Sequence, residues 1–238
     1  MSSDRSLHTP ASAHSHPEFI ATSATYFDHG AVAAPTAGTL PRPLSSDTPP
    51  THADLNDASP TGAFDALGLD RDILRSIQHA GYTAPTDVQS RAVPVAMRGI
   101  DLLVSSQTGS GKTAAFVWPA LQRILEARRD PARKRGKGQV WGPRVLVLAP
   151  TRELAMQVSR AFTVYGHSVP GLRVAHVVGG VPYHAQLKAL RGPLDVLIAT
   201  PGRLLDLMRS GAAIVGHVEM LVLDEADRML DMGFIDDI

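Results

Sequence analysis

The 238-residue sequence predicts an α/β domain, a parallel sheet covered by helices on both faces. Short apolar runs, such as Val145–Leu148 and Met220–Leu223, alternate with stretches whose apolar residues recur at helical spacing. The runs are continuous, as in strands that are buried on both faces. A glycine-containing loop and an acidic cluster each follow one of these runs. Both are therefore expected at the carboxyl edge of the sheet, where α/β domains place their sites.

The composition of the chain limits the class of protein to which it can belong. The counts of 23 Lys+Arg and 23 Asp+Glu give a formal net charge of zero. That balance neither supports nor excludes a nucleic-acid partner, because binding depends on a local basic face. The absence of cysteine excludes disulfides and thiolate metal sites. No apolar run is long enough to span a bilayer and the N-terminus has no apolar signal core, so we expect a cytoplasmic protein without membrane association.

Residues 1–61 are rich in Ser, Thr, Ala, Pro and His and show no sustained period of 2 or 3.6. Such a segment cannot bury enough apolar surface to offset its ordering entropy, so we predict a disordered low-complexity tail. We interpret the tripeptide Ser23-Ala24-Thr25 within it as coincidental. The folded domain is expected over 62–238, with Asp70 capping a first helix and Pro85-Thr86 starting a second.

The glycine-containing loop, Ser106–Thr113, lies between the apolar run Leu102–Val104 and a helical stretch. Gly109 and Gly111 would let backbone N–H groups converge on an anion at the start of that helix.

The side chains at the end of this loop suit a magnesium-bound nucleotide. Lys112 would reach the β and γ phosphates, and the Thr113 hydroxyl would ligate Mg²⁺. Ser106 stands where the strict pattern has its first glycine, so an ordinary glycine turn with an exposed lysine is the alternative.

A basic stretch from Arg128 to Arg144 contains glycines and has no apolar period. It could contact phosphate, but we favour a solvated insertion, because runs of like charge are usually solvated.

The acidic cluster, Asp224-Glu225-Ala226-Asp227, follows the last apolar run directly. Asp224 would hold Mg²⁺ through water, and Glu225 would orient and deprotonate an attacking water. The alternative is a helix N-terminus whose acids suit its dipole. The loop in the same chain favours the catalytic interpretation.

These motifs, in this order and spacing, closely resemble the first RecA-like domain of the DEAD-box ATP-dependent RNA helicases, over 64–238. The segments Phe64–Leu69 and Leu221–Phe234 look most like the bacterial RhlE-type branch. The remaining motifs of the resemblance are Gln107–Thr113, Pro150–Ala155, Gly179-Gly180 and Thr200–Arg203. The resemblance implies a P-loop domain that binds ATP and Mg²⁺, hydrolyses ATP and unwinds RNA.

The resemblance also implies roles for individual residues. Asp227 would couple the nucleotide site to the RNA. The catalytic residues would be Lys112, Asp224 and Glu225, with Thr113 and Asp224 on the metal. The nucleotide would be bound by Phe64 stacking on adenine, by Thr86 and Gln89 reading it, and by Gln107, Thr108, Gly109, Ser110, Gly111, Lys112 and Thr113. The RNA backbone would be bound, largely independently of sequence, by Pro150, Thr151, Arg152, Gly179, Gly180, Thr200, Pro201, Gly202 and Arg203.

Each of these roles has an ordinary structural alternative. Taken alone, Gln89 is a solvated helix residue, and Arg152 and Arg203 could form surface salt bridges. Asp87 replaces the proline that the family usually has before that glutamine.

The resemblance stops short of the family's next strand, which ends in Ser-Ala-Thr, and of the second RecA-like domain. The missing strand would lie between the strands that precede Ser106 and Asp224, so we expect a central gap in the sheet with unpaired backbone groups. We expect this C-terminally truncated, partial domain to be inactive alone. The competing hypotheses are a different P-loop enzyme acting on DNA and a non-catalytic fragment that binds RNA or a protein partner, whose identity the sequence leaves open.

Overall fold

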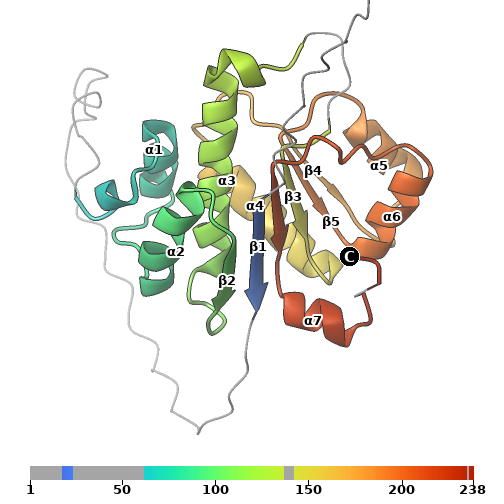
Figure 1. Cartoon of the computed structure of the whole chain (residues 1–238), viewed down its shortest axis with the longest axis horizontal. Coiled ribbons are helices and arrows are strands. Elements are labelled where there is room, and N and C mark those ends of the chain that lie inside the picture. The colour runs from blue at the N-terminus through green and yellow to red at the C-terminus, as the bar shows by residue number, and fades with distance from the viewer. Residues whose placement is uncertain (1–17, 24–61, 137–141, 235) are drawn as a thin grey trace, which may run out of the picture.

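The fold is a six-stranded, all-parallel sheet in the order β2-β1-β6-β3-β5-β4 (Figure 1). The computed structural model describes residues 18–23, 62–136, 142–234 and 236–238. The strands are β1 Glu18–Ser23, β2 Leu102–Ser105, β3 Val145–Leu148, β4 Val174–Val177, β5 Val196–Ala199 and β6 Met220–Leu223. Every apolar run that the sequence predicts to be a strand is confirmed.

Helices cover both faces of this sheet, as predicted. They are α1 Arg71–His79, α2 Asp87–Met97, α3 Lys112–Arg129, α4 Arg152–Tyr165, α5 Tyr183–Leu190, α6 Pro201–Arg209 and α7 Ala226–Asp231. Successive strand residues enter two different cores. Val145 and Val147 pack with α1 to α4, while Leu146 and Leu148 pack with α5 to α7. Burial on both faces is the physical reason for the continuous apolar runs of β3 and β5, whereas Leu103 of the edge strand β2 is 77% exposed.

The predicted helix starts are also confirmed. Asp70 caps α1 by accepting a hydrogen bond from the Asp72 N–H at 3.0 Å. Thr86 caps α2 in a reciprocal capping box with Gln89. Within the described residues no helix is long and apolar enough to cross a membrane.

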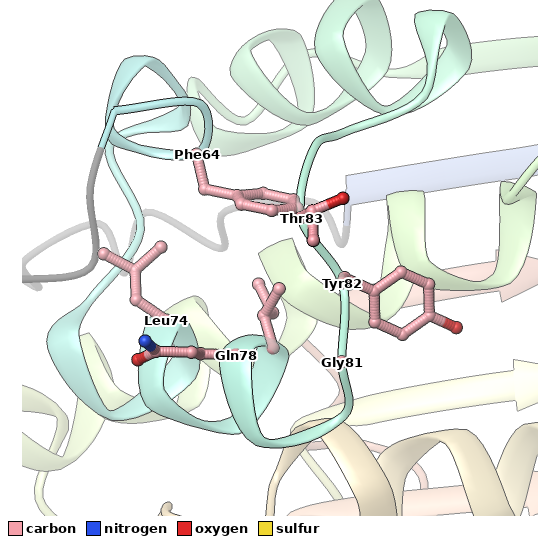
Figure 2. Close-up of a pocket in the computed structure, with 7 residues that line it drawn as sticks. Phe64, Leu74, Gln78, Gly81, Tyr82 and Thr83 are labelled. Atoms are coloured by element: carbon pink, nitrogen blue, oxygen red, sulfur yellow. The ribbon is translucent and has the colours of Figure 1, made fainter. Parts of the chain in front are cut away.

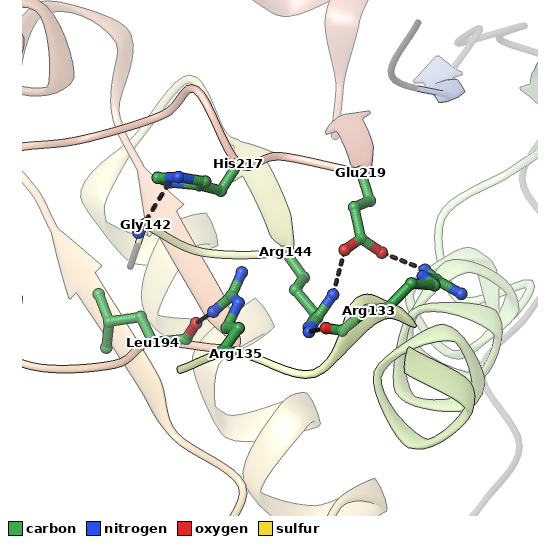
Figure 3. Close-up of polar contacts among 7 residues, drawn as sticks. All are labelled: Arg133, Arg135, Gly142, Arg144, Leu194, His217 and Glu219. Atoms are coloured by element: carbon green, nitrogen blue, oxygen red, sulfur yellow. Dashed lines mark hydrogen bonds and ion pairs between the residues drawn. The ribbon is translucent and has the colours of Figure 1, made fainter. Parts of the chain in front are cut away.

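The basic stretch differs from the expected solvated loop. Figure 3 shows that Arg133 and Arg144 both pair with the Glu219 carboxylate, and that Arg135 donates to the Leu194 carbonyl at 2.6 Å. Arg144 is buried, with 4% of its surface exposed. Burial lowers the pKa of the Arg135 guanidinium. These arginines are structural, so the expectation of a solvated insertion is wrong for them.

The same stretch is joined to two further acids. Arg128 pairs with Asp195 at 2.7 Å, and Arg129 pairs with Asp70 at the start of α1. Glu219 precedes β6 and Asp195 precedes β5, so these contacts lie where strands begin. We call this set the amino-edge cluster: Asp70, Arg128, Arg129, Arg133, Arg135, Arg144, Asp195 and Glu219.

The expected central gap is also wrong. The strand β1, from the predicted disordered tail, lies between β2 and β6 and pairs in parallel with both. In register, Ile20 is opposite Leu102 on one side and Val222 on the other. The tripeptide at 23–25 begins where β1 ends, and its last two residues lie outside the described residues, as does the rest of the tail.

Candidate functional site

The phosphate loop, the acidic cluster and the predicted RNA-contact loops each follow a strand at the carboxyl edge of the sheet. Because all strands are parallel, these loops lie along one edge, which carries the arrowheads in Figure 1. The order of the strands separates them into two groups. The phosphate loop follows β2 and the acidic cluster follows β6, at one half of the edge. The predicted RNA-contact residues follow β3, β4 and β5, at the other half.

The phosphate loop needs both of its glycines. Gly109 and Gly111 have φ of 80° and 93°, in the left-handed region that favours glycine. A Cβ atom on Gly111 would lie 2.4 Å from Nε2 of Gln89, far inside van der Waals contact. Gly111 begins α3, an 18-residue helix whose first N–H groups have no partner within the helix. This loop and helix start therefore fit an anionic phosphate.

The side chain of Lys112 folds back onto the phosphate loop. Its ammonium donates to the Ser106 carbonyl and to the Gln107 carbonyl, the latter at 3.0 Å. The hydroxyls of Ser106 and Ser110 are 2.6 Å apart across the same loop. Serine in place of the first glycine therefore adds a contact that glycine could not make.

The start of α2 packs directly on the phosphate loop. The Thr86 hydroxyl donates to the Ser110 carbonyl at 2.8 Å, and Gln89 Nε2 donates to the Gly111 carbonyl at 3.3 Å. Gln89 Oε1 accepts from the Thr86 N–H at 2.9 Å. Only 2% of Gln89 is exposed, so it is not the solvated helix residue of the alternative interpretation. Adenine reading by Gln89 stays a prediction, and the contact that the structure adds is the one that holds α2 against the loop.

Phe64 borders a cavity of about 350 Å³ between α1 and the loop that follows it (Figure 2). Its ring packs edge-on against Trp118 with centroids 5.7 Å apart and is 9% exposed. The cavity is lined by Phe64, Leu74, Ile77, Gln78, Gly81, Tyr82 and Thr83. Neither Thr86 nor Gln89 lines it, so the three residues predicted to bind adenine do not share one cavity wall. Stacking of Phe64 on a base stays a prediction.

Tyr82 is held in place at the rim of this cavity. Its hydroxyl accepts a hydrogen bond from the Tyr165 hydroxyl at 2.9 Å, which joins the loop before α2 to the end of α4. Burial, together with that hydrogen bond, raises the pKa of Tyr165 above its ordinary value. Sequence reasoning missed this pair, because 83 residues separate the two tyrosines.

The acidic cluster sits at the end of β6. Asp224 is 7% exposed, and its backbone N–H donates to the Leu148 carbonyl at 2.9 Å, which extends the sheet by one residue. Glu225 has φ 54° and ψ 51°, so it holds a left-handed conformation that costs a non-glycine residue roughly 1–2 kcal/mol. It is the only non-glycine residue with positive φ in the described segments. Such strain concentrates at functional sites.

Asp227 has a buried oxygen without a partner. Its Oδ1 atom makes no hydrogen bond to any residue that the structure describes. A buried acceptor without a partner is costly, and this one lies on the first turn of α7, two residues after Glu225. The carboxylate is therefore available for a hydrogen-bond donor brought by a ligand or another segment.

Lys112 begins the helix after β2, Asp224 follows β6, and these two strands flank β1. Neighbouring strands are spaced by about 4.8 Å, so the ends of β2 and β6 are roughly 10 Å apart. That separation suits groups that approach one triphosphate from two sides. For a metal, this half of the edge offers the Thr113 hydroxyl and the Asp224 carboxylate. Mg²⁺ uses one or two carboxylates together with phosphate oxygens and water, so this donor set fits it.

The other half of the edge gathers Arg152, Gly180 and Arg203. A Cβ atom on Gly180 would lie 3.6 Å from Nη1 of Arg152, so this loop and the start of α4 are neighbours. Arg203 donates to the Val181 carbonyl at 3.0 Å, and its guanidinium lies over the Tyr183 ring at 5.8 Å. Arg203 thus contacts the glycine loop, where the alternative interpretation expected a surface salt bridge.

The glycine loop is also anchored from α5. Gln186 is 4% exposed and accepts from the Val178 N–H at 2.9 Å while donating to the Val178 and Val181 carbonyls. Sequence reasoning missed both Gln186 and Tyr183, because it assigned no helix to 183–190. The signal was a polar residue at helical spacing from Leu190, on the inner face of that segment.

The two helices that start on this half begin differently. The Thr151 hydroxyl caps α4 by accepting from the Leu154 N–H at 3.3 Å. Thr200 precedes Pro201 at the start of α6, and its hydroxyl makes no capping hydrogen bond. The structure places Pro150 and Gly202 beside these caps, so all the predicted RNA-contact residues lie in the same group of loops.

Known proteins resemble this chain in sequence. The profile of the DEAD/DEAH box helicase family matches residues 86–238. The chain is 42% identical over 179 residues to the DEAD-box ATP-dependent RNA helicase 52A of Oryza sativa, covering 74% of this chain and 30% of the relative. It is 44% identical over 175 residues to the ATP-dependent RNA helicase DeaD of Escherichia coli, covering 74% and 26%. The chain thus spans less than a third of the length of these relatives.

A solved structure is similar as well. It is that of a hypothetical ATP-dependent RNA helicase from Sulfolobus tokodaii, with a TM-score of 0.61 and 37% sequence identity. The match covers 71% of this chain and 45% of that one.

Proposed function

Because the chain belongs to the DEAD/DEAH box helicase family, we propose that the phosphate loop and the acidic cluster form one Mg²⁺–ATP site, and that the loops after β3, β4 and β5 bind RNA. The observation that carries the proposal is the sheet order. It brings Lys112 and Asp224 to the same edge on either side of β1. In the whole protein, we propose that ATP hydrolysis stimulated by RNA drives local unwinding of RNA duplexes.

In the nucleotide site, the backbone N–H groups of the loop from Gln107 to Gly111 would hold the phosphates. Lys112 would leave the two carbonyls that it contacts here and pair with the phosphates. Thr113 and Asp224 would hold Mg²⁺, which supplies charge neutralisation at the phosphates when bound. Glu225 would accept the proton of the attacking water. Its left-handed backbone sets the direction in which the side chain leaves β6.

Thr86 and Gln89 would act at the adenine end. In the described structure they are already bonded to the carbonyls of Ser110 and Gly111. A base that bonds to Gln89 would therefore affect the phosphate loop through a single side chain. We propose that this contact communicates occupancy of the adenine site to the phosphates, with Phe64 supplying the stacking surface.

On the RNA side, Arg152 and Arg203 would contact phosphates, and the starts of α4 and α6 would add backbone N–H donors. Such contacts read shape and backbone, so binding would be largely independent of sequence. The unpaired Asp227 Oδ1 would accept a hydrogen bond when the two halves of the edge act together.

The finer identity belongs to the same proposal. We place the chain in the bacterial RhlE-type branch, on the segments Phe64–Leu69 and Leu221–Phe234, and we place the protein in the cytoplasm. Activity assays against RhlE-type substrates and cell fractionation would test these two points.

The proposal is tested by binding of a fluorescent ATP analogue in the presence of Mg²⁺. We expect Lys112→Ala to weaken binding of the analogue by at least tenfold, because alanine lacks the ammonium group that would pair with the phosphates. Lys188→Ala is the matched control, since this lysine lies on α5 away from the phosphate loop. Equal affinities for the wild-type protein, Lys112→Ala and Lys188→Ala would contradict the proposal.

Two other functions remain as alternatives. A non-catalytic RNA-binding fragment predicts that affinity for single-stranded RNA is unchanged by Mg²⁺–ATP and by Lys112→Ala. A P-loop enzyme acting on DNA predicts that DNA replaces RNA in stimulating hydrolysis by the whole protein. RNA and DNA oligonucleotides of the same sequence, compared with and without nucleotide, distinguish all three functions.

A further inference from the structure

The strand β1 is the connection between the phosphate loop and the rest of the sheet. In the described structure β2 is an edge strand whose only ladder partner is β1. On its other side, β1 pairs with β6, which carries the acidic cluster. We propose that residues Glu18–Ser23 act as a docking strand that holds the two halves of the nucleotide site together, and that docking of this strand and nucleotide binding strengthen each other. The inference rests on the proposed function for its second part only.

The register supports this role. β1 pairs with β2 from Ile20 opposite Leu102 to Ser23 opposite Ser105, the residue that precedes the phosphate loop. It pairs with β6 from Glu18 opposite Met220 to Ala21 opposite Leu223, the residue that precedes Asp224. The strand therefore reaches the start of both functional loops. Removing it would leave two facing rows of unpaired backbone N–H and C=O groups.

The composition of the segment suits a strand that can bind and leave. It contains one aromatic and two β-branched residues, which favour strands, among its six residues. It is tied to the rest of the domain only through residues 24–61, which give a contour of at most about 130 Å at 3.3–3.6 Å per residue. That length lets the strand dock on its own domain. We commit to this arrangement within one chain, and exchange between two copies is an outcome that the experiments would detect.

The coupling follows from the position of the strand. A triphosphate that contacts Lys112 and Asp224 binds both halves at once, so it binds better when β1 fixes their separation. By thermodynamic linkage, the nucleotide must then favour the docked strand by the same factor. We expect a factor of about tenfold, within the usual range for coupled sites.

The first experiment is Ile20→Pro in the full chain, with Ile20→Val as the matched control. Proline removes an N–H from a strand that pairs on both sides, whereas valine keeps the strand preference. We expect Ile20→Pro to speed amide exchange at Leu102–Ser105 and Met220–Leu223 and to weaken nucleotide binding about tenfold. Unchanged exchange in both strands would overturn the proposal.

A rescue experiment separates loss of docking from general damage. A synthetic peptide with the sequence of residues 16–26 is added to the Ile20→Pro protein. We expect it to restore slow exchange in β2 and part of the nucleotide affinity. No restoration at peptide concentrations up to millimolar would count against a docking site for this strand.

The second experiment keeps the proposal testable if Ile20→Pro does not fold. The chain has no cysteine, so an introduced pair is the only one that can form a disulfide. Ala21 and Leu103 are Cα partners, and adjacent strands lie within the Cα separation that a disulfide requires. We expect Ala21→Cys/Leu103→Cys to form an intramolecular disulfide in a monomer.

The control for the cross-link is Phe19→Cys/Leu103→Cys, which is two positions out of register. Its Cα atoms would be about 8 Å apart, too far for a disulfide. Equal yields for the two pairs, or disulfides formed only between two copies, would overturn docking within one chain.

The coupling is measured separately from the docking. Amide exchange of residues 18–23 should slow about tenfold on addition of Mg²⁺–ATP in the wild-type protein and not in Lys112→Ala. If Ile20→Pro exposes β2 but nucleotide changes nothing, the proposed nucleotide site is wrong and the docking strand stands. If nucleotide binds fully to Ile20→Pro, the coupling is wrong and the nucleotide site stands.

Discussion

The two edges of the sheet use charge in opposite ways. At the amino edge, Arg144 is buried and paired, and its neighbours Arg128 and Arg133 also bond to carboxylates. At the carboxyl edge, Lys112 donates to the backbone carbonyls of Ser106 and Gln107, and within the described residues Asp227 Oδ1 has no hydrogen-bond partner. Charges that neutralise one another within the fold contribute stability. Charges that bond to weaker, replaceable partners are left for a ligand.

The two edges also differ in how their loops are held. The amino edge is held by ion pairs that join residues 59 to 86 positions apart. The phosphate loop at the carboxyl edge is held by neutral hydrogen bonds from Thr86 and Gln89. Changes at the amino edge should therefore affect folding, and changes at the carboxyl edge should mainly affect binding.

The largest effect on stability is expected from Arg144→Met. The change leaves Glu219 partly buried with one partner fewer and removes a bond to the Arg133 carbonyl. Breaking a buried ion pair in this way costs about 3 kcal/mol. Urea unfolding measures it. Arg91→Met is the matched control, because the Arg91 side chain is 80% exposed, and it should change stability by less than about 0.5 kcal/mol. If Arg144→Met lowered the free energy of unfolding as little as Arg91→Met does, the ion pairs of the amino edge would not stabilise the fold as we expect.

The next effect concerns the phosphate loop. Gly111→Ala should destabilise the protein by about 2 kcal/mol, because it combines a positive φ with a clash against Gln89. Gly109→Ala meets the same φ penalty but has nothing within 4 Å of the new Cβ atom, so it should cost about 1 kcal/mol. The difference between the two variants in thermal unfolding measures the packing of α2 on the loop. Equal losses of stability in the two variants would mean that the Gln89 side chain moves away from the new Cβ atom at no cost in free energy.

A smaller effect is expected in acid. Burial acts to raise the pKa of Asp70, but the hydrogen bonds from Arg129 and the Asp72 N–H hold the pKa below its ordinary value. A lowered pKa means that Asp70 contributes stability above the pKa of the unfolded chain, near 3.9, and loses it as the pH falls through the folded value. Asp70→Asn keeps a helix cap but removes this dependence. Between pH 5 and pH 2 the free energy of unfolding should fall less steeply in Asp70→Asn than in the wild-type protein. Parallel pH dependences of the two proteins would contradict the lowered pKa of Asp70.

The smallest effect on stability is expected at Glu225. Glu225→Asn places a residue that tolerates the left-handed conformation, so stability should rise by roughly 0.5 kcal/mol while the proposed base is lost. Ala226→Ser, at the next position, is the control for a general change at the start of α7. A marked loss of stability in Glu225→Asn would show that the Glu225 side chain stabilises the fold.

Sequence reasoning succeeded where information was local. Continuous apolar runs predicted the strands, Asp70 and Thr86 predicted helix starts, and the loop spacing predicted which residues share the carboxyl edge. It failed where partners are distant in the chain. The basic stretch looked solvated because Glu219 and Asp195 lie far along the sequence. Gln89 was assigned to adenine alone because nothing local indicates that Gly111 lies against its amide.

The central strand was missed for a different reason. The segment Glu18–Ser23 is short and lies in a region whose composition favours disorder, so its local preference predicted no strand. The strand is stabilised by pairing with β2 and β6, which lie on either side of it only in the folded domain. Tertiary context of this kind overrides local preference and cannot be read from six residues.

The central claim is that Lys112 and Asp224 meet around one magnesium-bound triphosphate, and isothermal titration of ATP into Asp224→Asn, with and without Mg²⁺, tests it most directly. Asp206→Asn is the control, because Asp206 is an exposed residue of α6. We expect Mg²⁺ to tighten ATP binding in the wild-type protein and in Asp206→Asn, and to have little effect in Asp224→Asn, while all three proteins unfold at similar urea concentrations. An equal tightening by Mg²⁺ in Asp224→Asn would contradict the claim.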